Sequence, residues 1–395
     1  MDILDLIGRN EPLFQDDLVN HKRTIDGIVS HSKFLVIGAA GSIGKAVTKE
    51  IFKRNPKKLH AVDLNENNLA ELVRELRSSK GYIDGEFKTF AIDCGGAEFN
   101  ALMNSSEEYD YFINLSALKH VRSEKDQFSL MRMLQTNIVN TVSTIEYAQV
   151  KGAHKYFCVS TDKAANPVNM MGASKRLMEK FLVHYSPHIN ISTARFANVA
   201  FSDGSLLHGF TNRLLQQQPI SAPNDVTRYF VTPSEAGILC LFSILLGDNL
   251  ETYFPISSTQ LKLTHFTDIA ERFLGSHGYE LRKCSSEQEA RSLASELIPK
   301  KVWPVYFFQS DTTGEKSFEE FYTPEERIDL SRFQNIGIIK AASSSEDVRV
   351  VDFLTELQKL SITAKYTRED LIDLLKNQLP ELNHQEKGKF LDEKM

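Results

Sequence analysis

The sequence has few cysteines, and their spacing indicates neither disulfide bonds nor a metal site. The chain of 395 residues contains only Cys94, Cys158, Cys240 and Cys284. These residues form no Cys-x-x-Cys pair and no cluster with the spacing of metal ligands. We therefore expect reduced thiols, as in a cytoplasmic protein, and no bound metal.

Long apolar runs and an excess of positive charge are also absent. No apolar stretch approaches the roughly 20 residues of a membrane span, and the N-terminus lacks a basic segment followed by an apolar core. The formal net charge of -6 provides no electrostatic footprint for nucleic acid or an anionic membrane. With 42% hydrophobic and 25% charged residues, the composition predicts a soluble, cytoplasmic, globular protein of about two domains.

A glycine-rich turn follows the first predicted strand, at residues 34–37, and precedes a helical pattern at residues 43–54. Glycines allow backbone N–H groups to close on a pyrophosphate, and the start of a helix adds partial positive charge. The order of strand, turn and helix therefore predicts a dinucleotide cofactor. The predicted loop residues are Gly38, Gly41, Ser42, Ile43 and Gly44.

Asp63 indicates which dinucleotide binds. It lies near the end of the second predicted strand, at residues 59–64, 19 residues after Gly44. A carboxylate at this place bonds the ribose diol of NAD and repels the 2′-phosphate of NADP, so NADP is the less favoured cofactor. The alternative for Asp63 is the N-cap of a helix at residues 65–78, and both roles could hold in one fold.

Six predicted strands alternate with helices over about 160 residues, which is typical of an α/β protein with a doubly wound parallel sheet. The strands are at residues 34–37, 59–64, 87–93, 111–115, 155–160 and 191–196, and one helix is at about 130–150. We divide the chain into an N-terminal arm (1–30), a cofactor-binding domain (31–200), a mostly substrate-binding region (201–330) and a C-terminal helical tail (331–395). Within the tail, Thr367 to Asp370 predict a capping box.

The stretch STDKAANPVNMMGASKR, residues 160–176, carries the candidate catalytic side chains. Thr161, Asp162 and Lys163 come just past the predicted end of a buried strand, at the edge where open α/β sheets bind ligands. The helical pattern resumes at Gly172. Met171 and Lys175 are four residues apart, which places them on one helix face.

This stretch resembles the signature of the CapD-like nucleotide-sugar 4,6-dehydratases of bacterial polysaccharide biosynthesis, in the short-chain dehydrogenase/reductase superfamily. Such proteins usually carry Tyr-x-x-x-Lys where this chain has Met171 and Lys175. The methionine is similar to that of the UDP-N-acetylglucosamine 4,6-dehydratases that retain configuration at C5. A thioether cannot exchange a proton, so the acid/base role of the tyrosine must pass to a neighbour.

The resemblance implies a Rossmann fold of the extended type with a smaller C-terminal substrate domain, bound NAD, a UDP-sugar substrate and a homo-oligomer. It implies Asp93 near the adenine, with a simple turn residue as the alternative, and it gives Arg9 only a weak connection to the cofactor. Thr312 and Thr313 stand where the family has Arg-Pro. The further implied contacts are Ser116 and Lys175 to the cofactor, and Lys119, His120, Asn198, Ser205, Arg228 and Glu315 to the substrate.

The implied enzyme is a lyase that converts UDP-N-acetylglucosamine to UDP-2-acetamido-2,6-dideoxy-4-hexulose. Hydride leaves C4 for NAD, the C5 proton and the C6 hydroxyl are lost as water, and the hydride returns to C6. We assign Lys163, with a depressed pKa, to the C5 proton and Asp162 to the departing hydroxyl. Thr161 orients the C4 hydroxyl, which Asp162 deprotonates through water, and Lys175 anchors the nicotinamide ribose.

Three alternatives remain open. A UDP-sugar 4-epimerase shares the fold and the oxidation at C4 but needs no base for C5. A dehydratase that inverts C5 is disfavoured by Met171. A non-catalytic NAD sensor would explain the missing tyrosine, but it would have no use for Asp162, Lys163 and Lys175 together.

Overall fold

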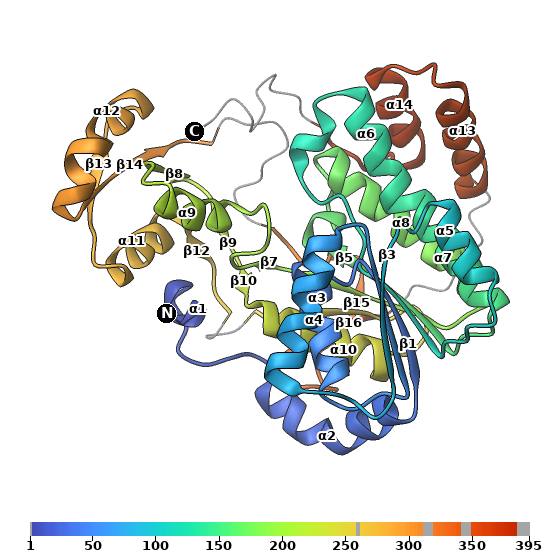
Figure 1. The fold of residues 1–395 in the computed structure, drawn as a ribbon. Coiled ribbons are helices and arrows are strands. Elements are labelled where there is room, and N and C mark those ends of the chain that lie inside the picture. Colours follow the sequence, from blue (N-terminus) through green and yellow to red (C-terminus); the bar gives the residue numbers. More distant parts are fainter. Residues whose placement is uncertain (1, 258–260, 311–318, 341–348, 385–395) are drawn as a thin grey trace.

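A nine-stranded sheet lies at the centre of the protein (Figure 1). The computed structural model describes residues 2–257, 261–310, 319–340 and 349–384. The strands from β11 to β3 run parallel, and β16 and β15 run antiparallel at one edge. Across the sheet, the order is β15 (Arg327–Asp329), β16 (Ile336–Lys340), β11 (Thr252–Pro255), β6 (Ile191–Phe196), β5 (Lys155–Thr161), β4 (Tyr111–Asn114), β1 (Lys33–Ile37), β2 (Lys58–Asp63) and β3 (Glu86–Ala91).

The expected α/β fold with a doubly wound parallel sheet is confirmed, and the sheet is larger than the six predicted strands. The additional strands β11, β16 and β15 come from residues after 250, so part of the expected helical tail (331–395) belongs to the central sheet. Four predicted strand ends were wrong by one or two residues. Strands β2, β3 and β4 end earlier, at Asp63, Ala91 and Asn114, and β5 continues through Thr161.

Helices cover both faces of the sheet. Phe157 and Val159 of β5 belong to the core on one face, and Tyr156 and Cys158 belong to the core on the other. This burial on both sides explains the continuous apolar strands of the sequence. The first face carries α2 (Gln15–Ser30), α3 (Ser42–Phe52), α4 (Glu66–Lys80) and α10 (Pro233–Leu246), and the second carries α5 (Ala97–Asn104), α7 (Asn140–Val150) and α8 (Met170–Tyr185).

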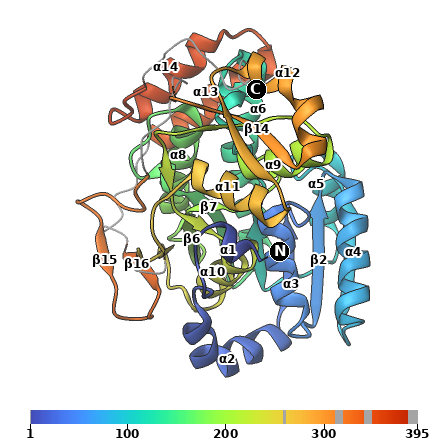
Figure 2. The ribbon, with the colours of Figure 1, turned by 90° about the vertical axis from the view of Figure 1, so that its left-hand side faces the viewer.

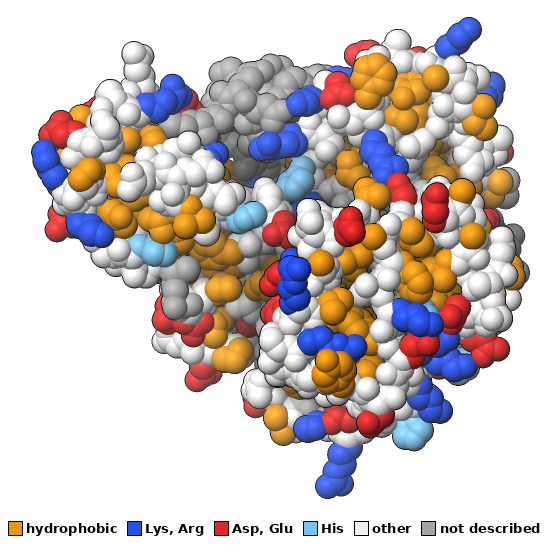
Figure 3. All heavy atoms as spheres, viewed as in Figure 1, with side chains coloured by type: hydrophobic (Ala, Val, Ile, Leu, Met, Phe, Trp, Pro, Cys, Tyr) orange, Lys and Arg blue, Asp and Glu red, His pale blue; other side chains and the backbone are white. Residues whose placement is uncertain are grey.

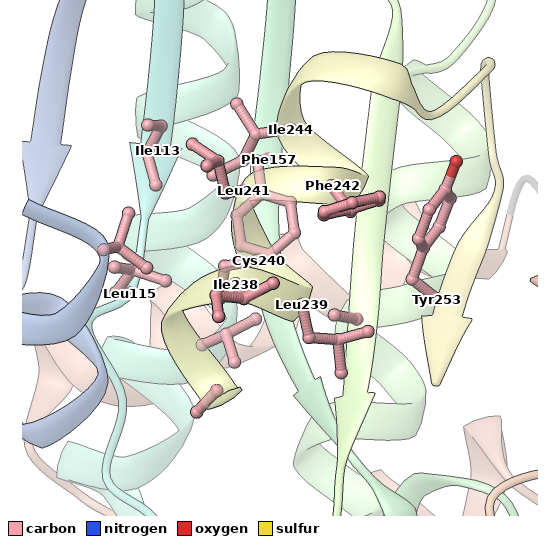
Figure 4. Close-up of a cluster of buried hydrophobic side chains, with 14 of the residues drawn as sticks. Ile113, Leu115, Phe157, Ile238, Leu239, Cys240, Leu241, Phe242, Ile244 and Tyr253 are labelled. Atoms are coloured by element: carbon pink, nitrogen blue, oxygen red, sulfur yellow. The ribbon is translucent and has the colours of Figure 1, made fainter. Parts of the chain in front are cut away.

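Helix α10 is apolar because it is buried almost all around. Leu239, Leu241 and Phe242 are fully buried, beside strand residues such as Ile113 and Phe157 (Figure 4). A helix that is hydrophobic on every side is expected inside a large core. Among the described residues, no helix is both long enough and apolar enough to cross a membrane.

The helix predicted at residues 130–150 is interrupted. It consists of α6 (Gln127–Leu134), a π-helical turn η2 (Gln135–Val139) and α7. Within the turn, the Asn137 side chain accepts a hydrogen bond from Leu118 N and donates one to Leu118 O, both 3.0 Å long. It also donates to Ser174 Oγ at 2.9 Å. The turn thus joins the loop after β4 to helix α8.

The last described helices pack on the sheet domain, whereas the N-terminal segment contacts both the sheet domain and a second core, to which Leu6 and Ile7 belong. Helix α13 (Arg349–Thr363) and helix α14 (Arg368–Gln378) share an apolar cluster with α6 and α8. The capping box at Thr367 and Asp370 is confirmed. At the other end, α1 (Ile3–Leu6) precedes α2, and Arg9 forms a buried ion pair with Glu235 of α10.

A smaller lobe stands beside the sheet domain (Figures 1 and 2). Its core contains the fully buried Trp303 and aromatic side chains such as Phe210 and Phe273. The lobe contains a parallel sheet in the order β13 (Glu280–Cys284), β14 (Val302–Phe308) and β8 (Ile220–Pro223), with α9 (Leu206–Leu215), α11 (Phe266–Ser276) and α12 (Glu287–Leu297).

Two of the remaining short elements, η1 (Val121–Glu124) and η3 (Asp162–Ala164), contact helices of the sheet domain, and η4 (Ile298–Lys300) contacts α12 and β14 of the smaller lobe. The short strand pairs are β7 (Asn198–Val199) with β10 (Phe230–Val231) and β9 (Thr227–Arg228) with β12 (Thr264–His265).

Candidate functional site

A cavity of about 860 Å³ lies between the sheet domain and the smaller lobe. Figure 3 shows a hollow between these two parts, with histidine, lysine and arginine side chains gathered around it. The carboxyl ends of β1, β4 and β5 face this cavity, as expected for a ligand site in an open parallel sheet. The candidate residues that line it are Gly38, Gly41, Ser42, Ile43, Gly44, Lys119, His120, Thr161, Asp162, Lys163, Met171, Lys175, Asn198 and Ser205.

Two of the three glycines in the loop leave no room for a side chain. Gly38 has φ of +75°, and a Cβ there would lie 2.6 Å from Ser116 N. A Cβ on Gly44 would lie 1.9 Å from Gly38 O. Helix α3 begins directly after the turn, at Ser42, so its N-terminal N–H groups point into the place predicted for a pyrophosphate.

A second cavity, of about 270 Å³, continues from the glycine loop and is lined by Asp63, Asp93 and Ser116. The Asp63 carboxylate accepts hydrogen bonds from Ala40 N at 2.8 Å and from Asn65 N at 2.9 Å. The alternative that Asp63 caps the next helix was wrong, because the Asn65 side chain is the N-cap of α4. Asp63 instead joins the glycine loop to the end of β2.

Asp93 is a turn residue that also faces the second cavity. Its carboxylate accepts from Gly95 N, and Arg132 Nη2 donates to it, both at 2.9 Å. Burial opposes ionisation, but these two donors outweigh it and lower the pKa of Asp93. Nearby, Thr136 Oγ1 is buried in the cavity wall with no hydrogen-bond partner among the described residues.

Thr161, Asp162 and Lys163 come together at the end of β5. Thr161 is the last residue of the strand, and a 3₁₀ turn places the next two side chains at the cavity. Thr161 Oγ1 donates to Asp162 Oδ1 at 2.8 Å, and Lys163 Nζ lies 3.2 Å from the same oxygen. The predicted cluster therefore forms one connected polar group.

The prediction that the pKa of Lys163 is depressed was wrong. Burial does lower the pKa, but the carboxylates of Asp162 and Glu319 outweigh burial, and the pKa of Lys163 is raised above its ordinary value. Glu319 Oε1 lies 3.7 Å from Lys163 Nζ. The second carboxylate comes from a distant part of the chain, so no local pattern of residues indicated it.

Met171 and Lys175 both face the cavity from α8, as their spacing predicts. The helix begins at Met170, earlier than predicted, because the Asn169 side chain caps it by accepting from Gly172 N at 2.8 Å. Lys175 is 3% exposed and its Nζ donates to Val159 O at 2.9 Å. Burial lowers the pKa of Lys175.

Lys119 and His120 form a second polar group on the cavity wall. Burial is the main cause that lowers the pKa of each side chain. The positive charge of Lys119 lowers the pKa of His120 further. Lys119 Nζ donates to Ser202 Oγ at 3.4 Å, which connects this group to the loop before α9.

Of the remaining predicted substrate contacts, two line the cavity, one does not, and one lies outside the described residues. Asn198 Nδ2 is buried at the cavity with no partner among the described residues, and Ser205 faces the cavity while its hydroxyl caps α9. Arg228 is buried but lines neither cavity. Its Nη1 donates to Thr227 O at 2.8 Å, and its Nη2 lies 4.0 Å from Glu319 Oε1. Glu315, Thr312 and Thr313 lie outside the described residues.

Sequence reasoning missed two acidic side chains at the site, Glu319 and Asp203. Ser42 Oγ donates to Asp203 Oδ2 at 3.0 Å, and Asp203 N donates to Ser42 Oγ at 2.8 Å, so the loop before α9 is bonded to the start of α3. No local pattern in the sequence marks either contact, because each joins residues that are far apart along the chain.

One further group of side chains could be mistaken for a metal site. Ligand atoms of His60, Glu86 and Glu107 lie within 4.8 Å of one another, away from both cavities. Lys58 pairs with Glu107, and Lys88 Nζ lies 2.8 Å from Glu86 Oε2. Because lysines already neutralise both carboxylates, we interpret this group as an ion-pair network and assign no metal to it.

Comparison with known proteins identifies the family. Residues 34–341 match the family described as polysaccharide biosynthesis protein. The chain belongs to this family. An uncharacterized membrane protein of Methanocaldococcus jannaschii is 28% identical over 322 residues, which are 80% of this chain and 87% of that protein.

Other relatives of this polysaccharide biosynthesis protein differ in length and in name. The capsular polysaccharide biosynthesis protein CapD of Staphylococcus aureus is 28% identical over 257 residues, or 64% of this chain and 41% of CapD. The UDP-glucose 4-epimerase of Rickettsia bellii is 26% identical over 224 residues, or 54% of this chain and 62% of the epimerase. The chain thus spans less than half of CapD and less than two thirds of the epimerase.

Solved structures agree on the fold. The dTDP-glucose 4,6-dehydratase DesIV from Streptomyces venezuelae has a TM-score of 0.57 and 16% identity, over 82% of this chain and 97% of DesIV. At this low identity the likeness shows the fold alone, which is a Rossmann-type α/β fold.

Proposed function

We propose that the protein is a UDP-N-acetylglucosamine 4,6-dehydratase that retains configuration at C5. The observation that carries the proposal is the position of Thr161, Asp162 and Lys163 on the same cavity as the glycine loop, with Met171 at the place of the usual tyrosine. An enzyme that removes both a C5 proton and a C6 hydroxyl needs an acid/base pair beside the cofactor.

The residues of the cleft fit NAD. The glycine loop and the start of α3 would hold the pyrophosphate, and Asp63 and the buried Thr136 hydroxyl in the second cavity would hold the adenosine. Lys175 would hold the nicotinamide ribose. When bound, NAD supplies the acceptor for a hydride from C4 and the donor of that hydride to C6.

The protein side chains supply position and proton transfers. Asp162 accepts the proton of the C4 hydroxyl through water and later donates it to the departing C6 hydroxyl. Lys163, once it is neutral, removes the C5 proton and returns a proton to C5 at the end of the reaction. Thr161, hydrogen-bonded to Asp162, orients the C4 hydroxyl. Because the pKa of Lys163 is raised, activity is expected to increase with pH until the amine is deprotonated.

The test is to incubate the purified protein with UDP-N-acetylglucosamine in deuterated water and to analyse the sugar by mass spectrometry and NMR. The expected product has lost one water, and it has a 4-keto group, deuterium at C5 and the original C5 configuration. Asp162→Asn and Lys163→Ala should each abolish turnover while NAD binding is unchanged. Lys300→Ala, on an exposed lysine of the smaller lobe, is the control and should retain full activity.

A UDP-sugar 4-epimerase is the second candidate, supported by the similarity to the Rickettsia bellii epimerase. An epimerase would return a C4 epimer of unchanged mass and would incorporate no deuterium at C5. Activity that persists in Lys163→Ala would also favour the epimerase, because inversion at C4 needs no base for C5.

A further inference from the structure

Glu319 is an acidic side chain beside Lys163 that the proposed mechanism does not use. It is 4% exposed, and its Oε1 lies 3.7 Å from Lys163 Nζ and 4.0 Å from Arg228 Nη2. Asp162 Oδ1 lies 3.2 Å from the same Lys163 Nζ. Lys163 therefore lies between two carboxylates, one from its own turn and one from the segment that follows β14.

Among the described residues, three charged groups face Lys163, namely Asp162 on η3, Arg228 on β9 and Glu319. The two carboxylates favour the ammonium form, and the guanidinium of Arg228 disfavours it. At 3.7 Å the contact with Glu319 is longer than a hydrogen bond, so its effect on Lys163 is mainly that of a nearby charge. A charge at this distance in a buried site has a strong effect on protonation.

The segment that carries Glu319 is held firmly in place. Arg195 Nη1 donates to Phe321 O at 2.9 Å, and the Phe321 ring stacks on Tyr229 at 5.5 Å between ring centroids. Arg195 is itself buried and bonded to Glu179 of α8. These contacts fix the backbone two residues after Glu319, so the carboxylate is a defined part of the site.

We infer that Glu319 is a positioning residue that holds the Lys163 ammonium opposite Asp162 and sets the pH at which Lys163 becomes a base. This inference rests on the proposed function, in which Lys163 removes the C5 proton. Glu319 also lies beside Arg228, the buried arginine that the resemblance implies as a substrate contact but that lines neither cavity.

The test measures the titration of Lys163 directly, without relying on turnover. The protein is labelled with acetic anhydride at a series of pH values, and mass spectrometry gives the extent of labelling at Lys163, whose side chain is 19% exposed at the cavity. In Glu319→Gln the midpoint of labelling should fall by at least about one pH unit, which is a tenfold gain of neutral amine below the midpoint.

Glu320→Gln is the matched control. Glu320 is the exposed neighbour whose Oε2 accepts from Asn166 Nδ2, and its loss should leave the Lys163 midpoint unchanged. Glu319→Asp keeps the charge and should restore most of the wild-type midpoint. Equal midpoints in Glu319→Gln and the wild type, with both proteins folded by circular dichroism, would overturn the inference.

Turnover then separates this inference from the proposed function. If the wild type is a dehydratase, the acidic limb of its pH profile should move to lower pH in Glu319→Gln by the same amount as the labelling midpoint. A wild type that produces no dehydrated sugar would refute the proposed function and leave the labelling result intact. A shifted labelling midpoint without a shifted activity profile would show that Lys163 is not the base.

Discussion

The two sides of the cleft are built in different ways. Within the glycine loop on the cofactor side, the residues that touch are close in the sequence, since Gly38 and Gly44 meet within one turn. On the substrate side, contacts join distant segments, such as Ser42 with Asp203, 161 positions apart, and Lys163 with Glu319. The cofactor side therefore depends on local backbone shape, whereas the substrate side depends on how the whole chain packs.

This difference predicts how each side fails. A change in the cofactor side should act through steric contact within one loop and should affect NAD first. A change at the junction with the substrate side should act through buried charge, and it should therefore depend on pH. The following variants test that contrast.

The largest effect is expected from Gly44→Ala. Its Cβ would lie 1.9 Å from Gly38 O and 2.7 Å from Ala39 C, and backbone atoms cannot rotate away. We expect NAD binding, measured by calorimetry, to be abolished and the protein to be destabilised by more than about 3 kcal/mol, the upper end for overpacking. Gly27→Ala, where a Cβ would meet nothing within 4 Å, should bind NAD normally. Normal NAD binding by Gly44→Ala would refute the claim that the cofactor side depends on the backbone shape of the glycine loop.

The next effect concerns a buried ion-pair cluster that joins α8, β6 and the segment before β15. Glu179 of α8 and Glu326 both bond Arg195, with Nη2 distances of 2.8 Å. Burial opposes ionisation of Glu179, but Arg195 outweighs burial and lowers its pKa from 4.5 to about 2. Because the folded-state pKa is the lower one, this carboxylate stabilises the fold above about pH 4.5, and that stability is lost as the pH falls toward 2.

Glu179→Gln should therefore destabilise the protein by about 3 kcal/mol at pH 7, because it leaves a buried guanidinium with one fewer counter-charge. Urea unfolding at pH 7, 4.5 and 3 measures this difference, which should shrink toward pH 3. Glu296→Gln removes an exposed partner of Lys300 and should cause no measurable change. A difference that stays constant across these pH values would argue that Glu179 contributes by packing alone.

The smallest effect is expected at Asp63, and it tests whether the charge of this residue selects NAD over NADP on the cofactor side. Asp63→Asn keeps the size of the side chain but removes the charge expected to repel a 2′-phosphate. The ratio of the dissociation constants for NADP and NAD should fall about tenfold, equivalent to about 1.4 kcal/mol. Fluorescence titration with the two reduced cofactors provides the ratio. An unchanged ratio would mean that Asp63 acts only through its hydrogen bonds to Ala40 and Asn65.

Most of the local structure was predictable from the sequence because, as in the glycine loop, its contacts join residues that are close together in the chain. Strand β6 and the capping box at Thr367 depend on residues that are neighbours in the chain. Strand β16 was not predicted, because it joins the sheet by pairing with β11, a long-range contact. The prediction that the pKa of Lys163 is depressed was wrong for a similar reason, because only the fold brings Glu319 beside Lys163.

The buried contact between Arg9 and Glu235 has a consequence for anyone who trims the chain. Glu235 is 1% exposed, and its carboxylate also accepts hydrogen bonds from Leu13 N and Thr232 N. Deleting the first 14 residues would leave this carboxylate inside the protein without its cation and without one of its donors. The arm thus belongs to the folding unit of α10, and the beginning of the Rossmann pattern at residue 33 is a poor place to start a shortened protein.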